Sequence, residues 1–232
     1  MAKINNFYDK KIVYKPWGYE YTIYRYRKNL IVTFLNIKKN KETSLHCHPN
    51  KRTGFILLKG KARIQLGLWK SNSKIYHSPS KLMIREGLFH SIKCLAKEDL
   101  CALEFENPVN KRDLVRFKDN YGRQSKPYEG KKFTKEITNE NILFKKPKLN
   151  KPQIYKIGKT QLSLELHKNF KKLNKEKMDT IFAILHGKVI NKSGKNVLSY
   201  GDIIKTGTLK KLSEVFSVKG KLAVLKVKKI VR

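Results

Sequence analysis

The chain has 232 residues, of which 53 are Lys or Arg and 18 are Asp or Glu, so its formal net charge is +35. Hydrophobic residues make up 40% and aromatic residues 10%, which is enough apolar material for a packed core and excludes wholesale disorder. No apolar run approaches the ~20 residues that span a bilayer, and residues 1–11 lack the apolar stretch of a secretory signal. The three cysteines, Cys47, Cys94 and Cys101, are an odd number and too few for a disulfide scaffold, so we expect a cytoplasmic location.

The positive charge does not by itself identify a partner. It favours polyanions in general, but 44 of the 53 basic residues are lysine, and lysine is abundant wherever codons are rich in A and T. The basic residues are also spread along the whole chain. We therefore do not expect nucleic acid as the partner, whereas a phosphorylated small molecule would suit the charge.

Short apolar segments rich in β-branched and aromatic residues follow one another along the chain, with turn signals such as Lys59-Gly60 and Lys219-Gly220 between them. The predicted strands are residues 19–26, 30–37, 55–58, 62–68, 100–105, 180–185, 188–190 and 222–227. Helix is expected only at residues 110–118 and, for a turn or two, at 168–175. Many short strands at this spacing predict an all-β sandwich or barrel.

Residues 126–150 carry proline and glycine among polar and lysine-rich positions, which is typical of a linker. A similar unit lies on either side of this segment. FILLKGKA at residues 55–62 and IFAILHGKV at 181–189 both predict a strand, a tight glycine turn and a second strand. A weak repeat of about 100 residues predicts two small barrels, and we place them at residues 1–125 and 151–232.

His46 and His48 form the sharpest local feature of the sequence, and His90 follows later in the chain. Residues i and i+2 of a β-strand point to the same face, so the first two imidazoles would lie side by side. A third imidazole from a neighbouring strand would complete a three-nitrogen site with open positions for substrate. We predict a divalent metal ion (Zn, Fe, Mn or Ni) at these three histidines, against the alternative of a chance pair of surface histidines.

The stretch HCHPNKRTGFILLKG that starts at His46, together with REGLFH ending at His90, resembles the two motifs of the cupin family. The resemblance implies jelly-roll barrels with a metal inside, and two such barrels would make the chain a bicupin. Counting back from Gly60, the place of the usual glutamate ligand is taken by Thr53, a poor metal ligand. The resemblance therefore implies three histidine ligands without the carboxylate.

The resemblance extends to one particular group of cupins through three further stretches: YKPWG at residues 14–18, LEFE at 103–106 and DLVRFKDNYGR at 113–123. They are similar to motifs of the cupin-type mannose-6-phosphate isomerases. The same domain also forms the C-terminal part of the mannose-1-phosphate guanylyltransferases. The similarity runs from residue 14 to residue 123, about half of the chain. It implies a small-molecule substrate from carbohydrate metabolism, a phosphorylated sugar that is converted between its aldose and ketose forms.

That reaction needs a metal to stabilise enediolate charge, a base to move a proton, and cationic groups to hold the phosphate. The candidates for the base are Glu104 and Glu106, which share one face of an alternating strand. The candidates for the phosphate are Arg63, Arg85 and Lys61, and in addition Arg116 and Arg123. We interpret Arg116, with Asp113 and Asp119, as a structural network at the edge of the barrel.

The second half lacks this chemistry. Aligned on Gly187, its His-x-His region falls within residues 171–175, which contain no histidine, and its second-motif histidine position is Lys210. We expect a degenerate barrel without metal that serves packing, homodimerisation or substrate cover. Two alternative functions stay open: a three-His iron dioxygenase or metal-dependent lyase acting on a small acid, and a non-catalytic cupin that binds carbohydrate or a polyanion.

Overall fold

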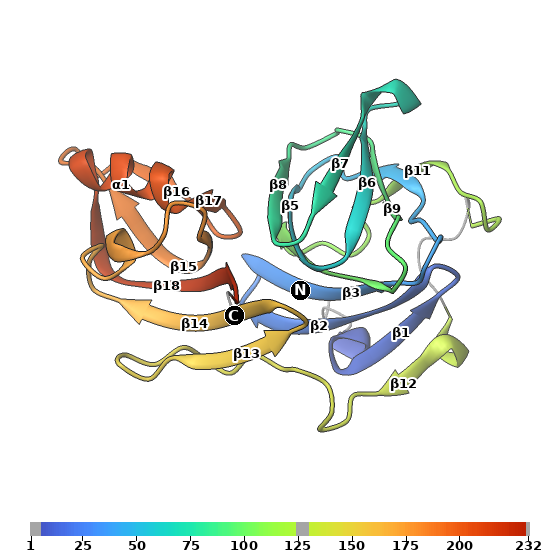
Figure 1. Cartoon of the computed structure of the whole chain (residues 1–232), viewed down its shortest axis with the longest axis horizontal. Helices are drawn as coiled ribbons and strands as arrows, with labels where there is room; N and C mark the ends of the chain where they lie inside the picture. Colours follow the sequence, from blue (N-terminus) through green and yellow to red (C-terminus); the bar gives the residue numbers. More distant parts are fainter. Residues whose placement is uncertain (1–5, 124–129, 231–232) are drawn as a thin grey trace, which may run out of the picture.

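The computed structural model of the chain describes residues 6–123 and 130–230. These residues form three antiparallel β-sheets, one α-helix and four short 3-10 helices (Figure 1). The helices are α1 (Thr206–Val215), η1 (Asn6–Lys10), η2 (Lys70–Asn72), η3 (Lys131–Phe133) and η4 (Leu173–Lys175). The predicted all-β class is confirmed. None of the described helices is long and apolar enough to cross a membrane.

The first sheet has seven strands in the order β12-β1-β2-β3-β10-β5-β8. The strands are β1 (Lys11–Lys15), β2 (Gly18–Tyr26), β3 (Leu30–Ile37), β5 (Arg52–Lys59), β8 (Ser80–Ile84), β10 (Leu100–Asn107) and β12 (Thr134–Glu136). Strands β3, β5 and β10 are buried along nearly their whole length. This explains why they are almost continuously apolar in the sequence, since strands covered on both faces lack the polar alternation of surface strands.

The second sheet has five strands in the order β11-β4-β9-β6-β7 and closes a barrel with the first. The strands are β4 (Leu45–Cys47), β6 (Lys61–Leu66), β7 (Ser73–His77), β9 (His90–Cys94) and β11 (Val115–Lys118). The space between the two sheets is filled by apolar side chains that include Trp17, Phe55, Ile64 and Ile92. Two antiparallel sheets facing each other in this way form a jelly roll, the double-stranded β-helix.

The third sheet belongs to the second half of the chain and has the order β13-β14-β18-β15-β16, with β17 also paired to β15. The strands are β13 (Gln153–Ile157), β14 (Thr160–His167), β15 (Ile181–Ile190), β16 (Asn196–Leu198), β17 (Ile203–Lys205) and β18 (Ser217–Lys229). One face of the sheet packs against Leu209 of α1 and Leu173 of η4. The described part of this half is thus one sheet covered by helices on one face. The second barrel predicted at residues 151–232 remains a prediction.

The two halves of the chain share one hydrophobic core. Val32 and Phe105 of the first sheet belong to the same buried cluster as Leu164 and Leu185 of the third. The hydroxyl of Thr160 also donates a hydrogen bond across the junction, with 2.6 Å from its Oγ1 to the carbonyl oxygen of residue 58. The third sheet therefore covers the outer face of the first sheet, which would otherwise be an exposed apolar surface.

The structure differs from several of the sequence predictions. The strand, glycine turn and second strand predicted at residues 181–189 are one continuous strand, β15, whose pairing with β18 shifts register around His186. Residues 110–118 form a turn and strand β11 in place of a helix, because Arg116 pairs with His46 of β4 across the second sheet. Helix α1 has no counterpart among the predicted elements. Of the predicted linker, residues 126–129 lie outside the described part, and residues 134–136 form β12, which pairs with β1. The three cysteines are buried and free.

Candidate metal centre

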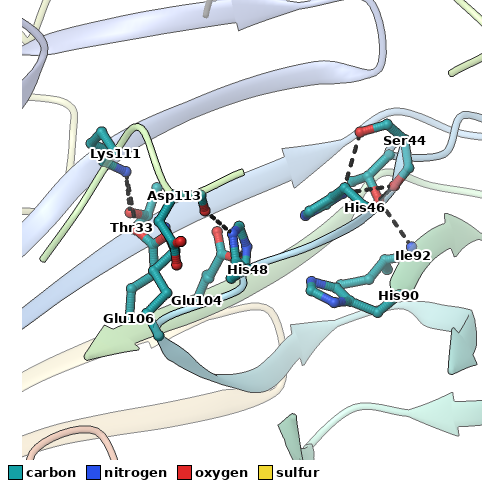
Figure 2. Close-up of polar contacts among 12 residues, drawn as sticks. Thr33, Ser44, His46, His48, His90, Ile92, Glu104, Glu106, Lys111 and Asp113 are labelled. Carbon is teal, nitrogen blue, oxygen red and sulfur yellow. Dashed lines mark hydrogen bonds and ion pairs between the residues drawn. The ribbon is translucent and has the colours of Figure 1, made fainter. Parts of the chain in front are cut away.

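Three histidines meet inside the first barrel (Figure 2). His46 lies on β4, His48 follows directly after this strand, and His90 begins β9, where it is the direct register partner of His46. The ring centroids are 4.5 Å apart for His46 and His90, 5.1 Å for His46 and His48, and 5.4 Å for His48 and His90. The pairing of β4 with β9 therefore brings together the three histidines that the sequence selects.

The Nδ1 atom of each imidazole forms a hydrogen bond with a backbone carbonyl oxygen. Because a carbonyl oxygen only accepts hydrogen bonds, each Nδ1 carries the proton, and the lone pair of each ring is left on Nε2. The Nε2 atoms of His48 and His90 are buried and have no hydrogen-bond partner within residues 6–123 and 130–230. The Nδ1 to oxygen distances are 2.8 Å from His46 to Ser44, 2.6 Å from His48 to Asp113 and 3.0 Å from His90 to Leu88.

This arrangement fits a divalent metal ion. The three histidines offer ligand atoms that all lie within 4.8 Å of one another. Burial lowers the pKa of His48 to about 4 and that of His90 to about 3, and it also lowers the pKa of His46 well below its usual value. The rings are therefore neutral, which is the form that binds a metal. A metal would also satisfy buried nitrogens that otherwise cost about 1–3 kcal/mol each.

Two carboxyl groups of β10, those of Glu104 and Glu106, line the same cavity, as the alternation of the strand predicts. Their surroundings differ. Lys51 and Lys111 both form ion pairs with Glu106, and although burial raises the pKa of Glu106, these ammonium groups lower it overall. Burial and the neighbouring Glu106 raise the pKa of Glu104 to about 8. Oε1 of Glu104 lies 4.0 Å from Nε2 of His48.

Of the candidates for phosphate binding, Arg116 and Arg123 line this cavity, whereas Arg63, Arg85 and Lys61 lie outside it. Arg63 lines a separate hollow on the outer face of the second sheet, and neither Lys61 nor Arg85 lines the histidine cavity. For Lys61 and Arg63 the reason is strand alternation, because Ala62 and Ile64 of β6 are buried in the barrel core and the alternate residues of the strand face outward.

Five cationic residues of the described chain line the cavity, and two of them, Arg116 and Arg123, are predicted candidates. The five are Lys15, Lys51, Lys111, Arg116 and Arg123. Lys51 was not among the predicted site residues, although it comes directly before β5, two and four residues before the inward-facing Thr53 and Phe55. Lys111 comes from a turn, where no periodic signal marks its direction.

The tail at residues 113–123 contacts the histidine cluster directly. The carbonyl oxygen of Asp113 accepts the Nδ1 hydrogen of His48, and its carboxylate accepts hydrogen bonds from the backbone and side-chain nitrogens of Asn50. Arg123 forms an ion pair with Asp119 at 2.6 Å, as a structural role would require. The tail is therefore both a structural element and the support of one imidazole.

We expect Asp113→Ala to weaken metal binding about 10- to 100-fold, the usual effect of removing a group that orients a ligand. Without the carboxylate, the segment that carries the supporting carbonyl is no longer fixed to Asn50. Titration calorimetry with Zn²⁺ measures the change. The exposed Asp179 provides the matched control, and equal affinities of Asp113→Ala and Asp179→Ala would contradict the orienting role.

A double-stranded β-helix with a histidine cluster in its interior, built from a His-x-His strand and a later histidine, defines a cupin. The family model described as mannose-6-phosphate isomerase C-terminal matches residues 3–119, and the chain belongs to this family. The matched region nearly coincides with residues 14–123, where the sequence motifs predicted a similarity to this family. No curated protein sequence matches the chain.

Solved structures with a similar fold share little sequence with the chain, and the chain covers less than two thirds of each of the following three. A Bacillus halodurans protein is 19% identical, with 36% of this chain and 65% of that chain covered and a TM-score of 0.34. The capsular polysaccharide assembling protein CapF from Staphylococcus aureus is 17% identical, with 47% and 34% covered and a TM-score of 0.41. Recombinant oxalate oxidase in complex with glycolate is 16% identical, with 38% and 46% covered and a TM-score of 0.34.

Proposed function

We propose that the chain is a metal-dependent isomerase that converts a phosphorylated sugar, of the mannose 6-phosphate type, between its aldose and ketose forms. The observation that carries the proposal is a single cavity that combines three imidazoles with available Nε2 lone pairs, two carboxyl groups and several cationic side chains. The family to which residues 3–119 belong supports the choice of reaction.

Aldose–ketose isomerisation moves a proton between two neighbouring carbons and develops negative charge on the sugar oxygens. A divalent metal held by His46, His48 and His90 would stabilise this charge. The proton would be moved by a carboxyl group of β10, where Glu104 and Glu106 both face the cavity. Because the apolar core of the barrel surrounds the cavity, these charges interact more strongly than they would in water.

The phosphate of the substrate would be held by cations at the cavity wall. The side chain of Lys111 is 34% exposed, so a ligand can reach its ammonium group, which also bonds to Glu106 at 3.2 Å. Arg116 lines the same cavity, where its Nη1 donates a hydrogen bond to the carbonyl oxygen of Arg123 at 3.3 Å, and a guanidinium has several donors with which to bind a phosphate. We assign phosphate binding to these two residues in place of Arg63, Arg85 and Lys61.

The test is an isomerisation assay on protein reconstituted separately with Zn²⁺, Mn²⁺, Fe²⁺ and Ni²⁺. We expect mannose 6-phosphate to be converted to fructose 6-phosphate, the activity to disappear on chelation, and unphosphorylated mannose to react far more slowly. Lys111→Met should reduce the preference for the phosphorylated sugar, whereas substitution of the outward-facing Arg63 should not. A metal-loaded protein that isomerises no hexose phosphate would contradict the proposal.

That outcome would favour the other two functions. Oxygen consumption with small acids tests the iron dioxygenase. Salt-dependent retention on heparin tests the polyanion-binding protein, since binding through released counterions falls steeply with salt.

A further inference from the structure

We infer that Glu104 supplies the carboxylate ligand whose place in the first cupin motif is taken by Thr53. The ligand set would then be three imidazoles from the second sheet and its adjoining loop and one carboxylate from the first. The inference rests on the metal centre of the proposed function and is independent of the reaction that this centre performs.

Thr53 occupies the position of the usual glutamate ligand in the first cupin motif, and this position is buried and has no carboxylate. Its side chain is 1% exposed, and its Oγ1 has no hydrogen-bond partner among the described residues. Thr53 lies on the inward face of β5, two residues after Lys51, which directly precedes the strand, and two residues before Phe55, and both of these residues line the cavity. A neutral hydroxyl does not offset the charge of a divalent cation, so an anionic ligand would have to come from another strand.

Glu106 is the register partner of Thr53 on β10, but its carboxylate is already engaged. Lys51 pairs with it and is 2% exposed, so this ammonium is buried as deeply as the apolar core. Lys111 contacts the second carboxylate oxygen at 3.2 Å. Moving Glu106 to a metal would leave a buried lysine without its counter-charge, which is strongly unfavourable.

Glu104 occupies the next inward position of β10 and is free of such pairing. No lysine or arginine within residues 6–123 and 130–230 forms an ion pair with it. Its carboxyl group lies beside the imidazole of His48, as Figure 2 shows, with 4.0 Å from Oε1 to Nε2. His48, Glu104 and Glu106 form a second group of potential ligands within 4.8 Å, and His48 belongs to both groups.

The charges of the cavity agree with this assignment. Three neutral imidazoles leave the full charge of a divalent metal uncompensated, and the charge of Glu106 is already offset by two lysines. A carboxylate at Glu104 reduces the charge on the metal and at the same time gains a cationic partner that the protein itself does not supply. The two carboxyl groups then have separate roles, with Glu104 binding the metal and Glu106 left to move the proton.

The experiment compares metal affinity in four variants, Glu104→Gln, Glu106→Gln, the double variant Thr53→Glu/Glu104→Gln, and the exposed control Glu140→Gln. Dissociation constants for Zn²⁺ come from competition with a chromogenic chelator, and the visible spectrum of the Co²⁺-loaded protein reports on coordination. We expect Glu104→Gln to weaken binding by more than about 100-fold and to alter the Co²⁺ spectrum. Such a loss exceeds the effect of removing a residue that only orients a metal ligand. Glu106→Gln should change the affinity less than Glu104→Gln, and Glu140→Gln should not change it.

The double variant is the decisive arm. Restoring a carboxylate at position 53 should recover at least about tenfold of the lost affinity, because the motif position faces the same cavity. Wild-type affinity in Glu104→Gln would overturn the inference and leave the metal centre intact, whereas a wild-type protein that takes up no metal would overturn both. If Glu104→Gln does not fold, as judged by circular dichroism, the double variant decides: metal binding supports the inference, and a folded double variant without metal overturns it.

Discussion

His48→Ala is expected to abolish stoichiometric metal binding. His48 is the one residue shared by both groups of potential ligands, so its loss removes a nitrogen from the three-histidine cluster and the anchor beside Glu104. The effect should exceed the 10- to 100-fold loss that is typical of residues outside the ligand shell. Elemental analysis of the purified and reconstituted protein measures metal per chain, and titration calorimetry measures the affinity.

Lys210→Ala is the matched control for this experiment. Lys210 takes the place of the second-motif histidine in the second half of the chain, and it is exposed on α1. We expect this variant to keep the wild-type metal content. Equal loss of metal in His48→Ala and Lys210→Ala would contradict the assignment of the metal to the first barrel.

Gly18→Ala is expected to destabilise the protein by about 3 kcal/mol or more, combining the cost of overpacking with that of a left-handed backbone. Gly18 has a φ of +149°, and a β-carbon built on it would lie 1.9 Å from the backbone oxygen of Asn36. Relief requires β2 and β3 to move apart, because Gly18 and Ile37 are register partners on these two strands. The movement would also displace Trp17, which lines the metal cavity.

Gly130→Ala provides the comparison for this substitution. Gly130 has a φ of −67°, and a β-carbon there would meet nothing within 4 Å, so we expect a change within about 0.5 kcal/mol. Urea denaturation followed by circular dichroism measures both variants. A Gly18→Ala midpoint equal to that of Gly130→Ala would show that β2 and β3 do not approach as closely as the structure has them.

Seven of the 18 strands in the described residues coincide with predicted segments, because the signals of these strands are local. β3 and β10 are apolar runs between turn residues, and their burial on both faces accounts for the missing alternation. The segment at residues 110–118 shows where local signals fail. Asn110 does bond to the following turn, through Oδ1 to the backbone nitrogen of Arg112, but pairing with β4, far away in sequence, makes the rest a strand.

The candidate site was predictable to the extent that strand periodicity fixes the direction of side chains. His46 and His48 are two residues apart, and Glu104 and Glu106 are likewise, so each pair had to face one side together. The same rule, applied to the apolar Ala62, would have predicted that the side chain of Arg63 points away from the cavity. Lys111 was beyond prediction, because it reaches Glu106 from a turn that only the tertiary structure brings close.

Anomalous diffraction from crystals of the protein grown with Zn²⁺ or Mn²⁺ is the most direct test of the metal centre. We expect one strong peak inside the first barrel, at bonding distance of about 2.0–2.2 Å from the Nε2 atoms of His46, His48 and His90 and from a carboxylate oxygen of Glu104. A peak bound by the histidines alone would remove Glu104 from the ligand set. A barrel without any peak, with the protein folded and the metal in excess, would contradict the assignment of a metal ion to the three histidines.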